Sequence, residues 1–195
     1  MKMKSKKKVF VTVLCAAALV VASVLGTMAY LTSQTETVTN TFTVGNVAIT
    51  LDEAKVSETG VPDEGAARVK ANDYKLIPGH EYTKDPTVHV TAGSEDSWLF
   101  VKVVDQIAGI EDTKTVAAQM DANGWTAVDG ATNVYAYKAK VNAGDNIKVF
   151  ENFTIKGTAA VADYAGKTIT IEAYAIQADG FDTAAAAWEA APGWN

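Results

Sequence analysis

The fold is decided by two neighbouring stretches, Gly26-Thr27-Met28-Ala29-Tyr30-Leu31-Thr32 and Thr41-Phe42-Thr43-Val44-Gly45-Asn46-Val47-Ala48-Ile49-Thr50-Leu51. Before the first stretch, five lysines between Lys2 and Lys8 precede an uncharged apolar run from Val9 to Leu25. A cationic start, an apolar run and small residues at the −3 and −1 positions of a cut are the three parts of a secretory signal peptide. We therefore predict cleavage between Ala29 and Tyr30, with residues 1–29 as signal peptide and residues 30–195 as one exported domain.

The apolar run has two other interpretations. Its 17 residues would just span a bilayer as a permanent anchor, but an anchor usually lacks a small-residue exit such as Thr27-Met28-Ala29, which favours cleavage. Cys15 would suggest attachment of a lipid, but it lies inside the apolar run and follows the bulky Leu14. We interpret Cys15 as a small apolar filler.

The composition of the exported part limits its partners. Its 166 residues are enough for one compact domain with a core. It holds all 23 acidic residues but only 12 of the 17 basic ones, which gives a net charge of −11. A field of that sign disfavours binding to nucleic acid or to anionic lipid. Because the single cysteine lies in the signal segment, no disulfide is expected.

Threonines alternate with other residues from residue 34 to residue 44, which predicts a strand that is polar on one face. After Gly45 the apolar residues shift to the odd positions Val47, Ile49 and Leu51, as at a β-bulge. Further strands are expected at residues 87–91, 98–104, 125–128, 133–141, 147–155 and 168–177. A long surface loop is expected at 52–73, a helical turn at 158–164, and short helices capped by Asp112 (to Met120) and Asp182 (to about Ala190). Without βαβ alternation, this order predicts an all-β fold, an antiparallel jelly-roll-like β-sandwich with short helical insertions.

Three blocks of sequence carry a family resemblance. They are residues 26–32 with 40–47, the segment Ile77-Pro78-Gly79-His80-Glu81-Tyr82-Thr83-Lys84-Asp85 leading through Val88-His89-Val90 to Gly93-Ser94, and the segment Ile169-Thr170-Ile171-Glu172-Ala173-Tyr174-Ala175-Ile176-Gln177. In this order and spacing the chain resembles the TasA/camelysin family of Gram-positive bacteria, whose signal peptides are cut by a dedicated SipW-type signal peptidase. It departs from many relatives in having Ser33-Gln34 where an acidic residue commonly follows the aromatic start, and it is shorter than the best-known fibre formers.

The resemblance implies a secreted structural subunit of biofilm-matrix or cell-surface fibres. Subunits of this kind join when the freed N-terminal segment of one copy adds as a strand to the next, so the expected partners are other copies and the signal peptidase. Mapped here, that exchangeable strand is residues 30–44, with Tyr30, Leu31, Thr35, Thr37, Val38, Thr39, Thr41, Phe42 and Val44 as the assembly residues. Two alternatives remain: an ordinary edge strand within its own domain, and a monomeric adhesion or ligand-binding domain.

The enzyme alternative is a metal-dependent peptidase, because camelysin was named as one. A zinc-protease helix needs two histidines at i and i+4 with a glutamate beside the first. His80-Glu81 begins this pattern, but position 84 is Lys84, Pro78-Gly79 predicts a turn, and the only other histidine is His89. We therefore predict no catalytic, metal or cofactor residues, with His80 in a solvated turn and His89 exposed on a strand.

Two weaker ligand hypotheses concern calcium and carbohydrate. The turns at residues 121–124 and 142–146 are acidic enough to consider calcium, but they lack the carboxylate density of a calcium loop and are expected to be solvated turns. Four tryptophans could suggest a carbohydrate platform. We expect Trp98 in the core and Trp188 against a helix face, and nothing in the sequence places the four together.

Overall fold

The structure is a computed structural model that describes residues 45–194, which belong to one compact unit. Its nine described strands are β1 (Ile49–Asp52), β2 (Glu81–Thr83), β3 (Thr87–Val90), β4 (Ser97–Asp105), β5 (Trp125–Ala127), β6 (Val134–Tyr137), β7 (Asn146–Lys148), β8 (Asn152–Thr154) and β9 (Ile169–Gln177). The helices are α2 (Val116–Ala122) and α3 (Ala184–Ala190), with 3-10 turns at Ala108–Ile110 and Val161–Tyr164. The predicted cleavage site and all the predicted assembly residues lie outside the described part.

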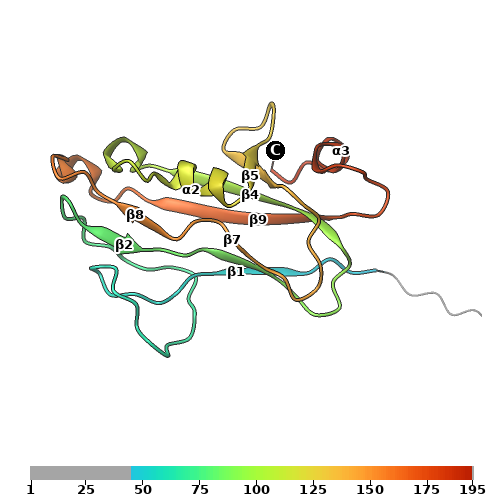
Figure 1. Ribbon diagram of the computed structural model, residues 1–195, viewed down its shortest axis with the longest axis horizontal. Coiled ribbons are helices and arrows are strands. Elements are labelled where there is room, and N and C mark those ends of the chain that lie inside the picture. Colours follow the sequence, from blue (N-terminus) through green and yellow to red (C-terminus); the bar gives the residue numbers. More distant parts are fainter. Residues whose placement is uncertain (1–44, 195) are drawn as a thin grey trace, which may run out of the picture. The chain divides into compact units, whose positions relative to one another are not determined.

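The described strands pair antiparallel in three sheets, with the orders β1-β3-β7, β2-β8 and β5-β6-β4-β9. Figure 1 shows the four-stranded sheet in one layer, with β1, β2 and β7 in the layer opposite. A mostly β fold with antiparallel sheets and two short helices is therefore confirmed. Within residues 45–194, no helix has the length and apolar character needed to cross a membrane.

Strand β4 explains how the core is divided. Leu99 and Val101 point into the main core between the layers, while Trp98 and Phe100 point to the outer face of their sheet. There they pack with Trp188 of α3 in a second cluster. The strand predicted at residues 98–104 is confirmed as part of β4, and its two apolar faces are both covered.

Both predicted helices begin later than expected. Thr115 caps α2, since its hydroxyl accepts a hydrogen bond from the Ala118 N–H at 3.1 Å, whereas the Asp112 carboxylate accepts one from Thr113. Thr183, rather than Asp182, caps α3 in the same way. An N-cap residue has an extended backbone, and its side chain accepts a hydrogen bond from the N–H two or three residues later. The sequence did not show which of the neighbouring polar residues met both conditions.

Other element predictions need correction. The strand expected at 147–155 is two strands, β7 and β8, in different sheets, because the chain breaks at Val149 and Phe150, which are both fully buried. The strand expected at 133–141 ends at Tyr137, and β2 was not predicted at all. The expected surface loop at 52–73 is partly internal, because Glu53 is buried and bridges Val69 through backbone hydrogen bonds.

Candidate functional site

Strand β9 is the longest edge strand in the described part of the chain. All nine of its residues pair with β4, and no other described strand pairs with its second side. Proteins usually protect such an edge with lysine, proline, a bulge or a covering segment. β9 contains no lysine or proline, and its one charged residue is Glu172. Its outer side is therefore an available template for another strand.

The backbone direction along β9 follows from the register. In an antiparallel pair, successive residues point their N–H and C=O groups alternately to one neighbour and the other. Ser97 exchanges both of its backbone hydrogen bonds with Val141, on the side of β4 away from β9. The odd-numbered residues of β4 therefore direct their backbone groups away from β9, and the even-numbered residues direct theirs toward it. Trp98 lies opposite Ile176, so the even-numbered residues of β9 bond to β4. The odd-numbered residues of β9 direct their backbone groups outward.

We call these odd-numbered positions the β9 edge; they are Ile169, Ile171, Ala173, Ala175 and Gln177. The first four also direct their side chains against the main core, where each is only half-buried. The strand predicted at residues 168–177 is confirmed as β9, and these four side chains share one of its faces. An added strand would thus find both unpaired backbone groups and incompletely covered apolar side chains at the same place.

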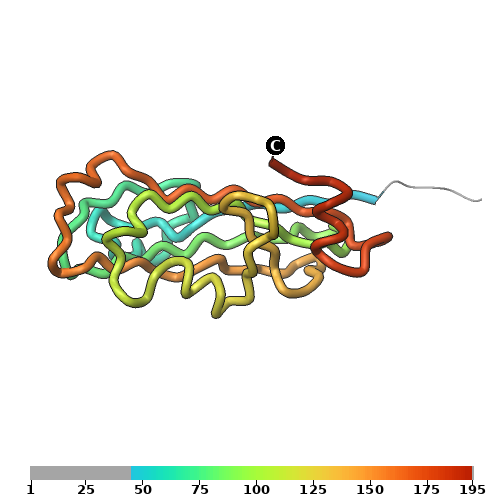
Figure 2. The backbone as a smooth tube through the Cα atoms, turned by 90° about the horizontal axis from the view of Figure 1, so that it is seen from above, coloured from blue at the N-terminus to red at the C-terminus, as the bar shows by residue number. Residues whose placement is uncertain are grey.

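A second open edge lies close by. Figure 2 shows β1 (cyan) and β9 (orange-red) running along the same long side of the described unit. Thr91 donates its N–H to the Ala48 carbonyl, so Ile49 and Leu51, one and three positions later, direct their backbone groups away from β3. The Ile49 and Leu51 side chains both pack against the main core.

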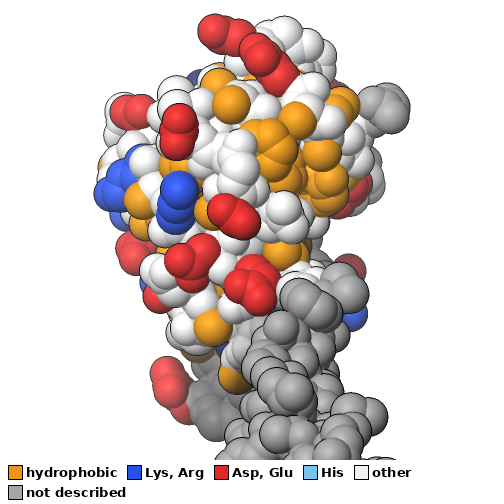
Figure 3. Space-filling model, turned by 90° about the vertical axis from the view of Figure 1, so that its right-hand side faces the viewer, with side chains coloured by type: hydrophobic (Ala, Val, Ile, Leu, Met, Phe, Trp, Pro, Cys, Tyr) orange, Lys and Arg blue, Asp and Glu red, His pale blue; other side chains and the backbone are white. Residues whose placement is uncertain are grey.

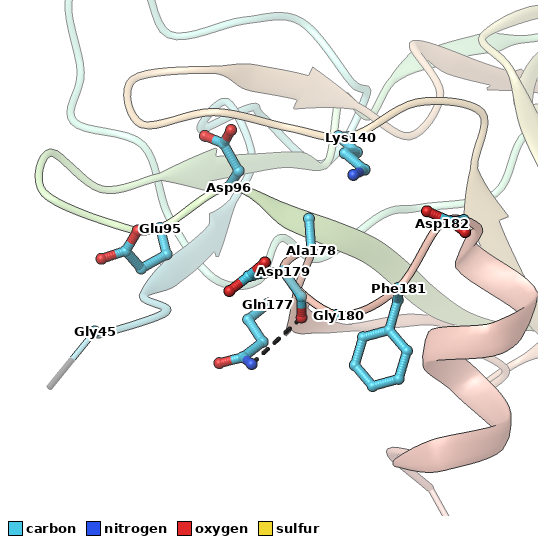
Figure 4. Close-up of a pocket in the computed structure, with 10 residues that line it drawn as sticks. All are labelled: Gly45, Glu95, Asp96, Lys140, Gln177, Ala178, Asp179, Gly180, Phe181 and Asp182. Atoms are coloured by element: carbon cyan, nitrogen blue, oxygen red, sulfur yellow. Dashed lines mark hydrogen bonds between the residues drawn. The ribbon is translucent and has the colours of Figure 1, made fainter.

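A hollow of about 770 Å³ lies where β9 ends. Four carboxylates line it (Glu95, Asp96, Asp179 and Asp182), together with Lys140 and with Gly45, at which the described chain begins. Figure 3 views this end of the molecule, where acidic side chains surround a patch of hydrophobic ones, and Figure 4 shows the lining residues. Gln177, the last residue of the β9 edge, donates its side-chain amide to the Asp179 carbonyl at this hollow.

His80 closes the predicted turn at Pro78-Gly79, and His89 lies on strand β3 as predicted, but both rings are half-buried and make contacts within the fold. The His80 ring contacts the Thr59 carbonyl through Nε2 at 2.8 Å and stacks edge-on against Tyr82. His89 is half-buried, and its two ring nitrogens contact Asn146 and, at 2.9 Å, Asp52. Burial acts to lower the pKa of His89, but these two hydrogen bonds outweigh it and raise that pKa.

The described residues contain no group of three or more histidine, cysteine or acidic side chains placed to hold a metal ion. In the two turns considered for calcium, the side chains serve the fold. Asn123 donates to the Val149 carbonyl at 3.1 Å, and Asp145 accepts the Asn142 N–H at 2.8 Å.

The tryptophans divide between the two apolar clusters. Trp98 and Trp188 are buried in the outer cluster, as predicted, and Trp194 packs against Trp188 with 5.9 Å between ring centroids. Trp125 lies in the main core. Three of the four are therefore closer together than the sequence indicated, but they are used for packing.

Comparison with protein-family models, with curated proteins and with solved structures gives no match to this chain.

Proposed function

We propose that this chain is a secreted structural subunit that assembles into extracellular fibres by strand addition, in which residues 30–44 of one copy pair with the β9 edge of the next. The observation that carries the proposal is the unprotected β9 edge. A jelly-roll-like β-sandwich with one strand position left open is the finer architecture that this function requires. Strand addition uses main-chain hydrogen bonds for affinity and alternate side chains for specificity.

The exchangeable strand has the composition that this edge needs. Residues 30–44 outnumber the nine residues of β9, so the segment is long enough to pair along the whole edge, ~30 Å at ~3.3 Å per residue. Val38, Phe42 and Val44 fall on one face of that segment. Facing inward, they would cover the half-buried Ile171 and Ala173, while the threonines would face water.

Deletion of residues 30–40 tests the donor half of the proposal. We expect the wild-type secreted protein to form sedimentable threads in electron micrographs, and the deletion variant to remain a folded monomer by circular dichroism and analytical ultracentrifugation. Threads of unchanged yield from the deletion variant would refute strand donation.

Ala173→Pro tests the acceptor half. The Ala173 N–H points away from β4, so proline there removes no existing sheet hydrogen bond but takes one donor from the β9 edge. We expect a folded protein that no longer polymerises. Glu172→Gln is the matched control, because Glu172 is the exposed neighbour whose backbone bonds to β4, and it should polymerise as the wild type does.

A further inference from the structure

A buried ion pair lies below the long connection between β1 and β2. Glu53 follows β1 and is 4% exposed, and Lys84 follows β2 and is 8% exposed. Lys84 Nζ donates a hydrogen bond to Glu53 Oε2 at 2.5 Å. The other oxygen, Glu53 Oε1, accepts one from Asn72 Nδ2 at 2.8 Å. A single buried carboxylate thus contacts both a primary amine and a primary amide.

The orientation of the Asn72 amide is fixed by its other partners. The Val56 N–H can only donate, so the atom that it contacts at 3.0 Å is Oδ1. The Ala54 carbonyl can only accept, so the atom that contacts it at 2.9 Å is Nδ2. A backbone N–H therefore lies where negative charge would develop on Oδ1 if Cγ were attacked, which is the geometry that stabilises a tetrahedral intermediate.

Aromatic rings form the wall of this site. The Tyr74 ring centroid lies 5.9 Å from Lys84 Nζ, and Tyr74 packs edge-on against Tyr82 and Phe153. Burial and the charge of Glu53 raise the pKa of Tyr74, so its hydroxyl stays protonated and donates to the Thr83 carbonyl. These rings keep the site poor in water, which strengthens its electrostatic interactions.

We propose that Lys84 and Asn72 become joined by an intramolecular isopeptide bond, with Glu53 as the catalytic acid and base. Lys84 transfers a proton to Glu53, and the free amine attacks Asn72 Cγ, so that the Nζ–Cγ bond forms and Oδ1 gains negative charge beside the Val56 N–H. The Cγ–Nδ2 bond then breaks. Glu53 takes two protons in turn from Nζ and returns both to the departing nitrogen, which leaves as ammonium. Atoms and charge balance without an external reactant, and Glu53 ends as a carboxylate.

The bond would fasten the connection between β1 and β2. Its residues make few sheet hydrogen bonds of their own, and the exported part has no cysteine that could form a disulfide. A covalent link between residues 72 and 84 would restrict the unfolded chain as a disulfide does. The covalent bond would also stay intact under pulling forces that separate an ion pair.

Mass spectrometry of the protein secreted from the full-length chain tests the proposal. The digest identifies the N-terminus of the secreted protein, and the sequence from that residue gives the unmodified mass. We expect the intact mass to be lower than this value by one ammonia molecule. Trypsin should yield residues 71–75 joined to residues 76–102, because a linked Lys84 is no longer cleaved. The unmodified mass, with separate peptides 71–75 and 76–84, would overturn the proposal.

Variants test whether the bond forms at Lys84 and whether Glu53 catalyses its formation. Glu53→Gln should give the full mass of its sequence and cleavage after Lys84, and Lys84→Arg should also remain unlinked. Lys55→Arg is the control, since Lys55 is exposed and forms an ion pair with Asp63, 3.4 Å away, outside the proposed site; the mass of this variant should remain lower by one ammonia. If Glu53→Gln forms the link as completely as the wild type, Glu53 is not the catalytic group.

Discussion

Glu111 is the buried carboxyl group that should make the stability of this domain depend on pH. It is 2% exposed, and its Oε2 accepts the Val116 N–H at the start of α2, at 3.0 Å. Its Oε1 has no hydrogen-bond partner among the described residues. Burial, and then the charge of the neighbouring Asp105, raise the pKa of Glu111 from 4.5 to about 7, although the hydrogen bond from the Val116 N–H and the charge of Lys156 act to lower it.

The sign of the effect follows from proton binding. Between about pH 4.5 and 7 the folded protein holds a proton on Glu111 that the unfolded chain has lost, so the free energy of unfolding falls as pH rises through this range. Each unit of pKa difference corresponds to about 1.4 kcal/mol, so the complete loss is about 3 kcal/mol. Between about pH 5.5 and about pH 8 the same linkage gives a loss of about 2 kcal/mol.

Glu111→Gln isolates this contribution, because glutamine keeps an oxygen for the Val116 N–H and cannot ionise. We expect the variant to gain stability relative to the wild type, by about 2 kcal/mol, between about pH 5.5 and about pH 8. Urea denaturation of both proteins at the two pH values measures the difference, and contributions from groups that do not interact with Glu111 cancel between them. Parallel losses of stability in the two proteins would show that Glu111 does not titrate in this range.

Two further predictions concern Gly60 and the ion pair of Asp52 with His89. Gly60 has a φ of +74°, and a Cβ there would lie 2.6 Å from Tyr82 Cα, so Gly60→Ala should lower the free energy of unfolding by roughly 1–3 kcal/mol. Gly65→Ala has a similar φ but open space around it, so denaturant melts should show a smaller loss; equal losses would mean that the contact with Tyr82 is unimportant. Asp52→Asn should lower the pKa of His89, measured by NMR titration of its ring protons, because it removes a negative charge 2.9 Å from Nε2. An unchanged His89 titration would contradict that contact.

The sequence predicted the elements whose side chains alternate strictly. Strand β9 is the clearest case, since Ile171, Ala173 and Ala175 share a face that contacts the core. Periodicity does not show which strand lies beside which, because pairing depends on contacts between residues far apart in the chain. That β9 is an edge was therefore not predictable, although its side-chain directions were.

The site of Glu53, Asn72 and Lys84 was also missed, for a related reason. The three residues come from irregular segments, and only the folding of the chain brings them together. In the sequence, Lys84 is visible only as the residue that interrupts a zinc-protease pattern. The feature that marks this site is that Lys84 is buried. The burial of a lysine cannot be predicted from the sequence of a turn-rich segment.

The measurement that tests strand addition most directly is hydrogen exchange at the β9 edge. The amides of Ile171, Ala173 and Ala175 point away from β4, so they should exchange rapidly in the soluble protein and become protected in fibres. The amide of Glu172, already bonded to β4, should be protected in both states. Fibres in which the three edge amides still exchange rapidly would contradict the account.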